Sequence, residues 1–347
     1  MRWLPLLGGA LVTGALAVLP AATAQQVTMR DLLRDVAQVT DAEWAAVSRG
    51  EAVAKVLGTD AREVAVAGVV RITAWSEKLV DRYREIENLK RSAIVLDIGR
   101  LGRPPRASDL SQVPFEEYDL DLRDCRAGEC RVRLGESEIA RFHREVNWSA
   151  ADWRVRSQAV WRDILAGYAD AYSRHGRRGL PSFANKRDPL SVPTELSLLV
   201  DRFGFVSAFA PNFFTYLREF GPGGPDGADA VMYWSKEDFG VRPVLRLSHQ
   251  SIYRTSGTPH AVLIATNQIY ANHYLDASLM LTMTVDAPES DGRPAFYMIS
   301  VSRARTRSLS GVLRSFVRST VQGRSRDALR KILASTKTSL EQAAAAR

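Results

Sequence analysis

The sequence has few of the residues that most often bind metals or catalyse reactions: its 347 residues include two cysteines and five histidines. Two cysteines exclude a disulfide-dense miniprotein, a zinc-ribbon array and cysteine-ligated iron–sulfur clusters. The chain also lacks a His-Glu-x-x-His metal motif, a Gly-x-Ser-x-Gly nucleophile motif and a glycine-rich phosphate loop. It therefore has no catalytic signature, and we expect neither a metal nor a cofactor.

The composition is that of a folded protein with a modest excess of positive charge. Apolar residues make up 46% of the chain, which is enough for a packed core and excludes wholesale disorder. The 47 Lys and Arg residues exceed the 39 Asp and Glu residues, and the net charge of +8 favours acidic partners or anionic surfaces. Nucleic acid is not expected as a partner, because the basic residues lack interleaved base-stacking aromatics.

Residues 1–24 have the pattern of a secretory signal peptide. Arg2 supplies a positive charge, residues 4–20 carry no charge, and Ala22-Thr23-Ala24 has small residues at the two positions that signal peptidase reads. We expect cleavage before Gln25 and a periplasmic or secreted mature protein. An uncleaved membrane anchor is the alternative, although the apolar run is short for a bilayer span of about 20 residues.

Export gives the two cysteines a structural interpretation. Cys125 and Cys130 lie in the segment Asp-Cys-Arg-Ala-Gly-Glu-Cys, whose glycine suits a tight turn. In an oxidising compartment they are expected to form a local disulfide that stabilises this turn. A redox-active or metal-binding pair is the alternative, but the spacing is wider than in the usual two-residue motifs and no further Cys or His lies nearby.

The first half of the mature chain mixes predicted helices and strands. Residues 25–59 form an N-terminal segment with helical spacing of apolar residues. β-Branched residues predict a strand over 63–74, which is followed at once by an amphipathic helix over 76–91. Strict alternation predicts a strand over 94–98, and the cysteine turn is expected to join two further short strands.

The second half separates helices from strands. Apolar residues recur with helical spacing over 136–220, and we expect this block to be a helical insertion. From 231 to 302 apolar residues alternate, which is typical of antiparallel strands, and one amphipathic helix is expected over 309–343. These elements predict an α+β fold in which a curved antiparallel sheet is covered by a long C-terminal helix.

This order of elements resembles the helix-grip fold of START-like proteins, the SRPBCC superfamily. The resemblance depends on Val69-Val70-Arg71-Ile72-Thr73-Ala74 with the helix that follows it, and on the late strands that lead into the C-terminal helix. It covers roughly residues 60–135 and 230–340, and it implies one START-like domain over residues 60–347 that the helical block interrupts. Members of the superfamily typically bind a hydrophobic molecule without catalysis, although some are enzymes.

Our first hypothesis is therefore a carrier of a hydrophobic, lipid-like molecule in a cavity between the sheet and the C-terminal helix. The expected lining combines a leucine-rich strand face, two histidines on predicted strands and an aromatic segment near residue 233. The residues expected to bind the ligand are Tyr233, Trp234, His249, Tyr253, His273, Leu275, Leu279, Leu281 and Met283.

Two other functions remain open at this point. The same scaffold is compatible with a hydrolase or another enzyme that uses His249 or His273 as an acid or base. It is also compatible with an envelope protein that binds a partner without any cavity. The arginines that would face an anionic membrane surface are Arg303, Arg305, Arg307, Arg314 and Arg318, with a solvated helix face as the alternative.

Overall fold

The computed structural model describes most of the chain downstream of the predicted signal peptide. The described residues are 36–90, 94–221, 228–238, 242–255, 260–290, 292–307 and 314–345. The predicted signal peptide, its cleavage point before Gln25 and the predicted first residues of the C-terminal helix lie outside them. Within these ranges, no helix has both the length and the apolar character needed to span a bilayer.

Eight antiparallel strands form one sheet in the order β1-β2-β10-β9-β8-β7-β6-β3. The alternating segment after residue 228 forms its centre as consecutive hairpins, and β2 joins this meander by pairing with β10. The strands are β1 (Val53–Val56), β2 (Glu63–Ile72), β3 (Val95–Arg100), β6 (Asp229–Asp238), β7 (Pro243–Arg254), β8 (Ala261–Ala271), β9 (Ala277–Ser290) and β10 (Arg293–Arg305). A separate short hairpin pairs β4 (Ser182–Phe183) with β5 (Leu190–Ser191).

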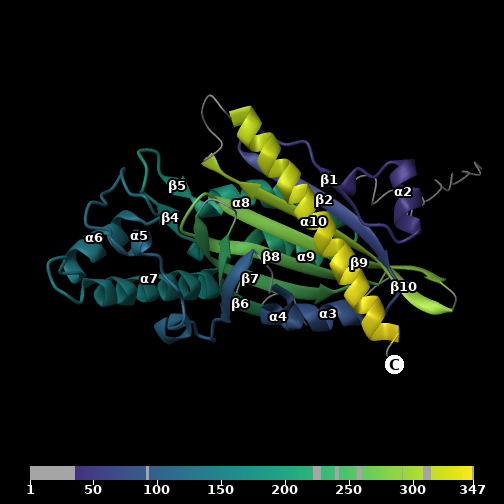
Figure 1. Ribbon diagram of the computed structural model, residues 1–347, viewed down its shortest axis with the longest axis horizontal. Coiled ribbons are helices and arrows are strands. Elements are labelled where there is room, and N and C mark those ends of the chain that lie inside the picture. Colours follow the sequence, from purple (N-terminus) through teal and green to yellow (C-terminus); the bar gives the residue numbers. More distant parts are fainter. Residues whose placement is uncertain are drawn as a thin grey trace, which may run out of the picture.

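Helices lie on both faces of this sheet (Figure 1). They are α2 (Asp41–Ser48), α3 (Glu77–Arg84), α4 (Ile86–Lys90), α5 (Glu117–Leu120), α6 (Glu136–Glu145), α7 (Trp153–His175), α8 (Val192–Val200), α9 (Pro211–Glu219) and α10 (Arg314–Ala345). Short 3₁₀ helices cover Ala107–Leu110, Gly176–Gly179 and Asp201–Ala208. The predicted α+β fold, with a curved antiparallel sheet and a long C-terminal helix packed on it, is confirmed.

The C-terminal helix α10 packs on β1 and β2. Figure 1 shows it crossing one face of the sheet, while α8 and α9 lie behind the strands. Gly68 in β2 permits the close approach, because a Cβ at this position would lie 2.6 Å from Cδ1 of Leu333. Leu333 is completely buried in a cluster that also includes Val70 of β2 and Phe296 of β10. Burying one such leucine stabilises the fold by about 2 kcal/mol.

The helical block over 136–220 covers the opposite face of the sheet. Its buried residues on α7 and α8 belong to one large apolar cluster with the side chains of β8 and β9 that point the same way. Proline at the start of α8 and α9 fits the first turn of a helix, where its missing N–H has no intrahelical acceptor. The block therefore supplies the packing partner of the leucine-rich face.

Two local expectations were wrong. The N-terminal segment is not entirely helical, because β1 (Val53–Val56) adds an edge strand to the sheet beside β2. The segment around the cysteines is not a strand pair, because it forms the short helix α5 and irregular turns. Leu120, Leu122, Val132 and Leu134 alternate like strand residues, but they are buried in the core shared with α7 and do not pair in a ladder.

Candidate functional site

The leucine-rich strand face does not lie beneath the C-terminal helix. Leu279, Leu281 and Met283 of β9 are buried in the cluster formed with α7 and α8, on the face of the sheet opposite α10. Their predicted position in a cavity under the C-terminal helix is wrong. Alternation along β9 separates the two faces of the strand correctly, but it contains no information about which helix covers each face.

The sheet face that carries α10 is polar at its centre. Ser248, Gln250, Thr266, Thr282 and Ser300 are buried there, and they alternate along their strands with the apolar residues of the other face. The Thr282 and Ser300 hydroxyls lie 2.7 Å apart, and the Gln250 amide donates to a backbone carbonyl of α3. This face therefore does not provide the lipid-like lining that we expected between sheet and helix.

Three further residues that were expected to bind the ligand are held by contacts within the protein. Trp234 is buried, its indole N–H donates to the Asp109 carbonyl at 3.2 Å, and its ring covers Gly99, where a Cβ would approach to 2.6 Å. Tyr233 on the same strand is also buried. Leu275 lies in the turn between β8 and β9, and its N–H donates to the backbone of His273.

The two predicted histidines do not meet. His249 lies on β7, where its Nδ1 is 2.8 Å from the hydroxyl of Tyr172 on α7. His273 is not in a strand but in the turn after β8, and its Nε2 is 2.8 Å from Oδ1 of Asp119. Tyr253, predicted with them, stacks on Phe213 with ring centroids 5.2 Å apart. His249 and His273 therefore belong to two separate pockets.

The pocket that contains His273 is rich in arginine. It has a volume of about 430 Å³, within the range of small-molecule sites, and we call it the basic pocket. Its cationic residues come from four segments of the chain. They are Arg131, Arg133, Lys186, Arg242 and Arg307. Asp276 is the only acidic residue among its lining residues in the described part of the chain.

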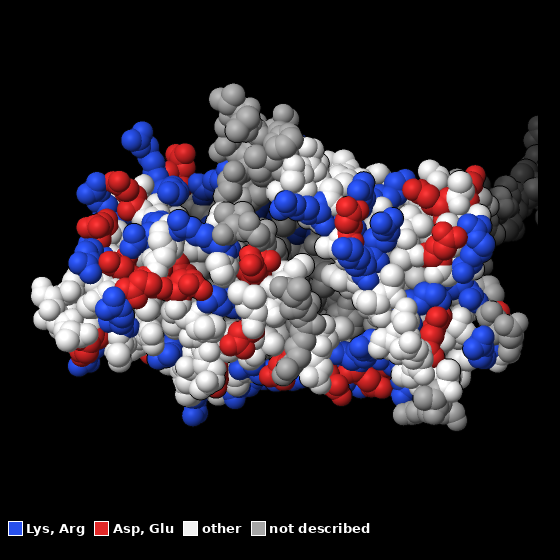
Figure 2. All heavy atoms as spheres, viewed as in Figure 1, with Lys and Arg blue, Asp and Glu red and all other residues white. Residues whose placement is uncertain are grey.

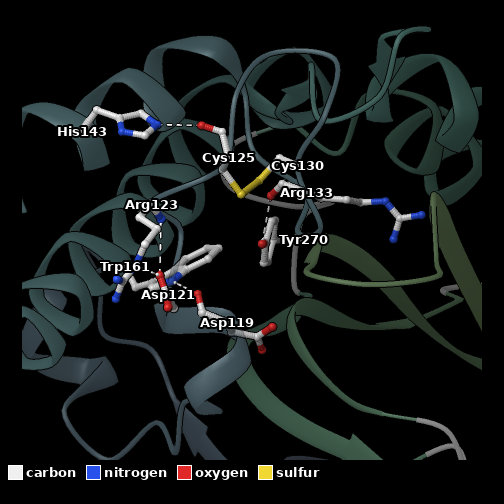
Figure 3. The surroundings of a disulfide bond; sticks show 9 residues. All are labelled: Asp119, Asp121, Arg123, Cys125, Cys130, Arg133, His143, Trp161 and Tyr270. Atoms are coloured by element: carbon white, nitrogen blue, oxygen red, sulfur yellow. Dashed lines mark hydrogen bonds and ion pairs between the residues drawn. A yellow bond between two sulfur atoms is a disulfide. The ribbon is translucent and has the colours of Figure 1, made fainter. Parts of the chain in front are cut away.

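The disulfide hairpin positions two of these arginines. Cys125 and Cys130 are bonded as predicted, and the backbone N–H of Cys130 donates to Asn185 beside Lys186. Two residues beyond Arg131, the Arg133 carbonyl accepts a hydrogen bond from the Tyr270 hydroxyl at 3.0 Å. Figure 3 shows the Arg133 side chain extending away from the disulfide, opposite to the helix that carries His143. The hairpin thus fixes the backbone from which Arg133 reaches the pocket.

Arg133 is the most deeply buried cation of the basic pocket. Only 7% of it is exposed, its Nη2 lies 2.6 Å from Oδ1 of Asp276, and its Nη1 has no hydrogen-bond partner. Burial lowers the pKa of Arg133, the Asp276 carboxylate opposes this effect, and the neighbouring charge of Arg307 lowers the pKa further. Two cations are therefore held close together with one buried N–H group still unpaired.

Aromatic and acid–base groups form one wall of the basic pocket. Two guanidinium groups lie over the Tyr118 ring, with Arg242 at 3.7 Å and Arg131 at 4.8 Å from its centroid. The Tyr118 ring is also 5.8 Å from the ring of His273, which pairs with Asp119. Cation–π contacts of this kind hold arginine side chains in defined positions without neutralising their charge.

The arginines expected to face a membrane have mixed surroundings. Arg305 is buried and Arg303 is partly buried, and both form ion pairs: Arg303 lies 2.5 Å from Glu63 and Arg305 lies 2.6 Å from Glu195, so neither belongs to a free surface. Arg318 donates to the Thr59 backbone, and the side chain of Arg314 lies outside the described residues. Figure 2 shows acidic and basic side chains interspersed on the face that carries α10. The membrane partner stays a prediction.

The described residues contain no group of three or more His, Cys, Asp or Glu side chains that is placed to bind a metal ion. Comparisons with protein-family models, with curated proteins and with solved structures found no match. The START-like resemblance therefore stays a prediction.

The sequence singled out two residues of the basic pocket, His273 as a ligand-binding residue and Arg307 as a membrane-facing cation, and it missed the other four cations. The Cys-Arg-Val-Arg segment at 130–133 was the available signal, because a disulfide that fixes two nearby arginines places them with little conformational freedom. Arg242 and Lys186 had no local signal, since they are distant in sequence and meet the hairpin only in the folded chain.

Removal of the disulfide is expected to lower the free energy of unfolding by about 2 kcal/mol, the entropic value for a loop this short. The Cys125→Ser/Cys130→Ser variant tests this in urea unfolding followed by tryptophan fluorescence. Reduced wild-type protein should unfold at the same urea concentration as the double variant. A wild-type transition that does not respond to the reductant would contradict the stabilising role of the bond.

Proposed function

We propose that this protein binds a small molecule through a doubly charged anionic group, of which a phosphate ester is the simplest, and that it does so without catalysis. The observation that carries the proposal is Arg133: a buried guanidinium with an unpaired N–H group, lining a ligand-sized pocket among four further cations. Buried polar groups normally have hydrogen-bond partners, and a bound anion would supply the missing one.

The charge of the basic pocket supports a dianion. Five cationic side chains line it and one carboxylate, Asp276, opposes them. Burial is the main cause of the lowered pKa of Arg133, and the positive charge of Arg307 adds to it, so the two cations repel each other. Arginine presents a planar set of donors that matches the oxygens of phosphate, and hydrogen bonds between charged groups are about twice as strong as neutral ones. A bound dianion would reduce this repulsion and would also accept a hydrogen bond from the unpaired Nη1 of Arg133.

This proposal keeps the expectation of a non-catalytic binding protein and changes the site and the ligand. The predicted apolar lining is packed against the helical block, so an apolar part of the ligand would contact Tyr118, Tyr274 and Leu190 at the edges of the basic pocket. Export remains part of the proposal. The Cys125–Cys130 disulfide supports it, because such bonds persist mainly in oxidising compartments.

Titration calorimetry with inorganic phosphate tests the proposal. We expect saturable binding at one site, which weakens as the ionic strength rises. Arg307→Gln and Arg242→Gln should each weaken phosphate binding about tenfold. Each substitution removes either a charge-assisted hydrogen bond to the anion or a nearby positive charge of similar effect. These two residues are preferred over Arg133, since removing Arg133 would leave Asp276 buried without its closest partner.

Arg126→Gln is the matched control, because Arg126 is an exposed cation of the same disulfide hairpin that does not line the pocket. It should leave phosphate binding unchanged. Equal weakening by all three substitutions would indicate a general charge effect and contradict the assigned site. Acetate is expected to bind more weakly than phosphate, since it has one charge.

A second arm identifies the source of the anionic group. Vesicles of phosphatidylcholine with phosphatidylglycerol present phosphate in a lipid headgroup, whereas inorganic phosphate represents a soluble ester. If the protein co-sediments with the vesicles and added phosphate prevents this, the ligand is a lipid headgroup. Phosphate binding without co-sedimentation would indicate a soluble ligand.

The enzyme alternative has one specific observation in its favour. His273 lines the basic pocket and is paired with Asp119 at 2.8 Å, an arrangement that orients a histidine as a general base. Hydrolysis of p-nitrophenyl phosphate by the wild-type protein, lost in His273→Gln while phosphate still binds, would favour an enzyme. Binding of phosphate by both proteins without turnover favours the binding protein.

A further inference from the structure

We propose a second binding site, the His249 pocket, which takes a small uncharged molecule with an apolar body and one hydroxyl group. It is a cavity of about 220 Å³, and none of its lining residues also lines the basic pocket. The inference does not depend on the proposed anion site.

Four elements and one loop surround the His249 pocket. Tyr172 comes from α7, Tyr216 from α9, Met232 from β6 and His249 from β7. Residues 103–105 also line the pocket, and the Arg103 guanidinium donates to the backbone carbonyl of Ala230. The site therefore lies where the helical block meets the sheet, at a junction that sequence periodicity does not reveal.

Unpaired polar atoms point to a ligand with a hydrogen-bonding group. The Tyr216 hydroxyl is buried, with 7% of the residue exposed, and has no hydrogen-bond partner. The buried Ser251 hydroxyl lies close enough to lower the pKa of Tyr216 against the larger effect of burial, but the two hydroxyls do not reach hydrogen-bond geometry. By contrast, the Tyr172 hydroxyl lies 2.8 Å from Nδ1 of His249 and 3.3 Å from Oδ1 of Asn267. An unpaired buried hydroxyl is unfavourable by about 1–3 kcal/mol, and a ligand hydroxyl that pairs with it would recover part of this.

The charge state of the lining favours an uncharged ligand. Burial, reinforced by the positive charge of Arg103, lowers the pKa of His249 to about 4, so its imidazole is neutral at neutral pH. Burial raises the pKa of Tyr216 to about 12, so its phenol is neutral as well. Apart from Arg103, whose guanidinium donates to the Ala230 carbonyl, the polar lining residues are neutral donors and acceptors, and a cation placed among them would lose its hydration without a partner of opposite charge.

The remaining lining fits one apolar ring. Pro104, Pro105, Phe220 and Met232 supply flat or flexible apolar surfaces. A dry apolar cavity of about 150 Å³ is large enough for benzene, so a cavity of about 220 Å³ holds a ring with a substituent. Phe220 ends α9 with a φ of 44°, in the left-handed region that bulky residues rarely adopt. Such outliers are concentrated at functional sites.

Phenol is the probe, because it combines one ring with one hydroxyl and is neutral at neutral pH. Nuclear magnetic resonance of the histidine ring signals follows the titration, and the chain has only five histidines to assign. We expect a saturable shift of the His249 signals. Tyr216→Phe keeps the ring but removes the unpaired hydroxyl, and it should weaken phenol binding about fivefold, the value of one neutral hydrogen bond.

Tyr168→Phe is the matched control. Tyr168 lies on α7 and also has a buried hydroxyl, but it does not line the His249 pocket. It should bind phenol like the wild-type protein, and Ser173→Phe, which places a ring in the cavity, should abolish binding. Toluene lacks the hydroxyl and should bind with the same affinity to wild-type and Tyr216→Phe proteins.

Three results would overturn the proposal. One is the absence of a saturable shift of His249 in the folded wild-type protein. Another is equal phenol affinity in the wild-type and Tyr216→Phe proteins, and the third is undiminished binding in a folded Ser173→Phe protein. Phosphate added to saturation should leave the phenol affinity unchanged, so that a failure of the anion site is distinguished from a failure of this one.

Discussion

Asp276→Ala is expected to lower the free energy of unfolding by about 3–5 kcal/mol, the cost of leaving a buried charge without its partner. Asp276 is 1% exposed, and its carboxylate lies 2.6 Å from Nη2 of Arg133 and 3.3 Å from Nη2 of Arg62. Without this carboxylate, the buried Arg133 guanidinium keeps its charge with no acid close to it. Urea unfolding monitored by tryptophan fluorescence measures the loss.

Two comparisons separate this effect from the removal of any acidic residue. Asp163→Ala breaks an exposed ion pair with Arg141 and should change the stability by about 1 kcal/mol or less. Arg133→Met combined with Asp276→Leu replaces the pair with apolar side chains and should recover much of the stability that Asp276→Ala loses. Similar losses for Asp276→Ala and Asp163→Ala would show that the Arg133 charge is not buried as described.

Phosphate connects this prediction to the proposed function. Since a bound dianion would take over the role of the missing carboxylate, phosphate should raise the stability of Asp276→Ala more than that of the wild-type protein. For each protein, the urea midpoint in phosphate is compared with the midpoint in sodium chloride at the same ionic strength. The two shifts are then compared. Equal shifts in both proteins would argue against an anion beside Arg133.

Acidification from pH 6.5 to pH 4 is expected to remove about 3 kcal/mol of stability through His249 alone. The folded-state pKa of His249 is about 4, because burial and the charge of Arg103 disfavour the imidazolium, whereas the ordinary value is 6.5. Below pH 6.5 the unfolded chain therefore binds a proton that the folded protein does not bind. The stability is complete above pH 6.5 and falls as the pH decreases towards 4.

His249→Gln should flatten this part of the stability profile, although the variant is less stable at neutral pH because the contact with Tyr172 changes. His175→Gln is the control, since His175 is exposed at the end of α7 and its replacement should leave the profile unchanged. Carboxylates titrate in all three proteins, so the informative quantity is the difference between profiles. A His249→Gln profile parallel to that of the wild type would contradict the buried neutral imidazole.

Local periodicity was sufficient for most of the elements. The helical spacing around Trp161 predicted α7, and the alternation around Leu281 predicted β9, because both patterns depend only on neighbours in sequence. Thr40 and Glu43, which are three residues apart, form both reciprocal hydrogen bonds of a capping box at the start of α2. These features are determined by contacts within a few residues.

The failures have a common physical origin. His273 follows the alternation of β9 in the sequence, yet it lies in the turn because Asp119, which is 154 residues away, accepts its hydrogen bond. Leu120 and Val132 alternate like strand residues, but the core beneath α7 takes up their side chains without any ladder. In each case a tertiary partner outweighs the local preference.

The sequence alone determined which side chains share a face of a strand or helix and that the two cysteines can close a local loop, because those relations follow from backbone geometry over short distances. Only the tertiary structure decided that the leucine-rich face packs against the helical block while α10 packs on the opposite face, across β1 and β2. It also brought Tyr118, Arg133, Arg242 and Arg307 into one pocket. Contacts of this kind, between residues that are distant in sequence, depend on the packing of the whole chain, which no local pattern encodes.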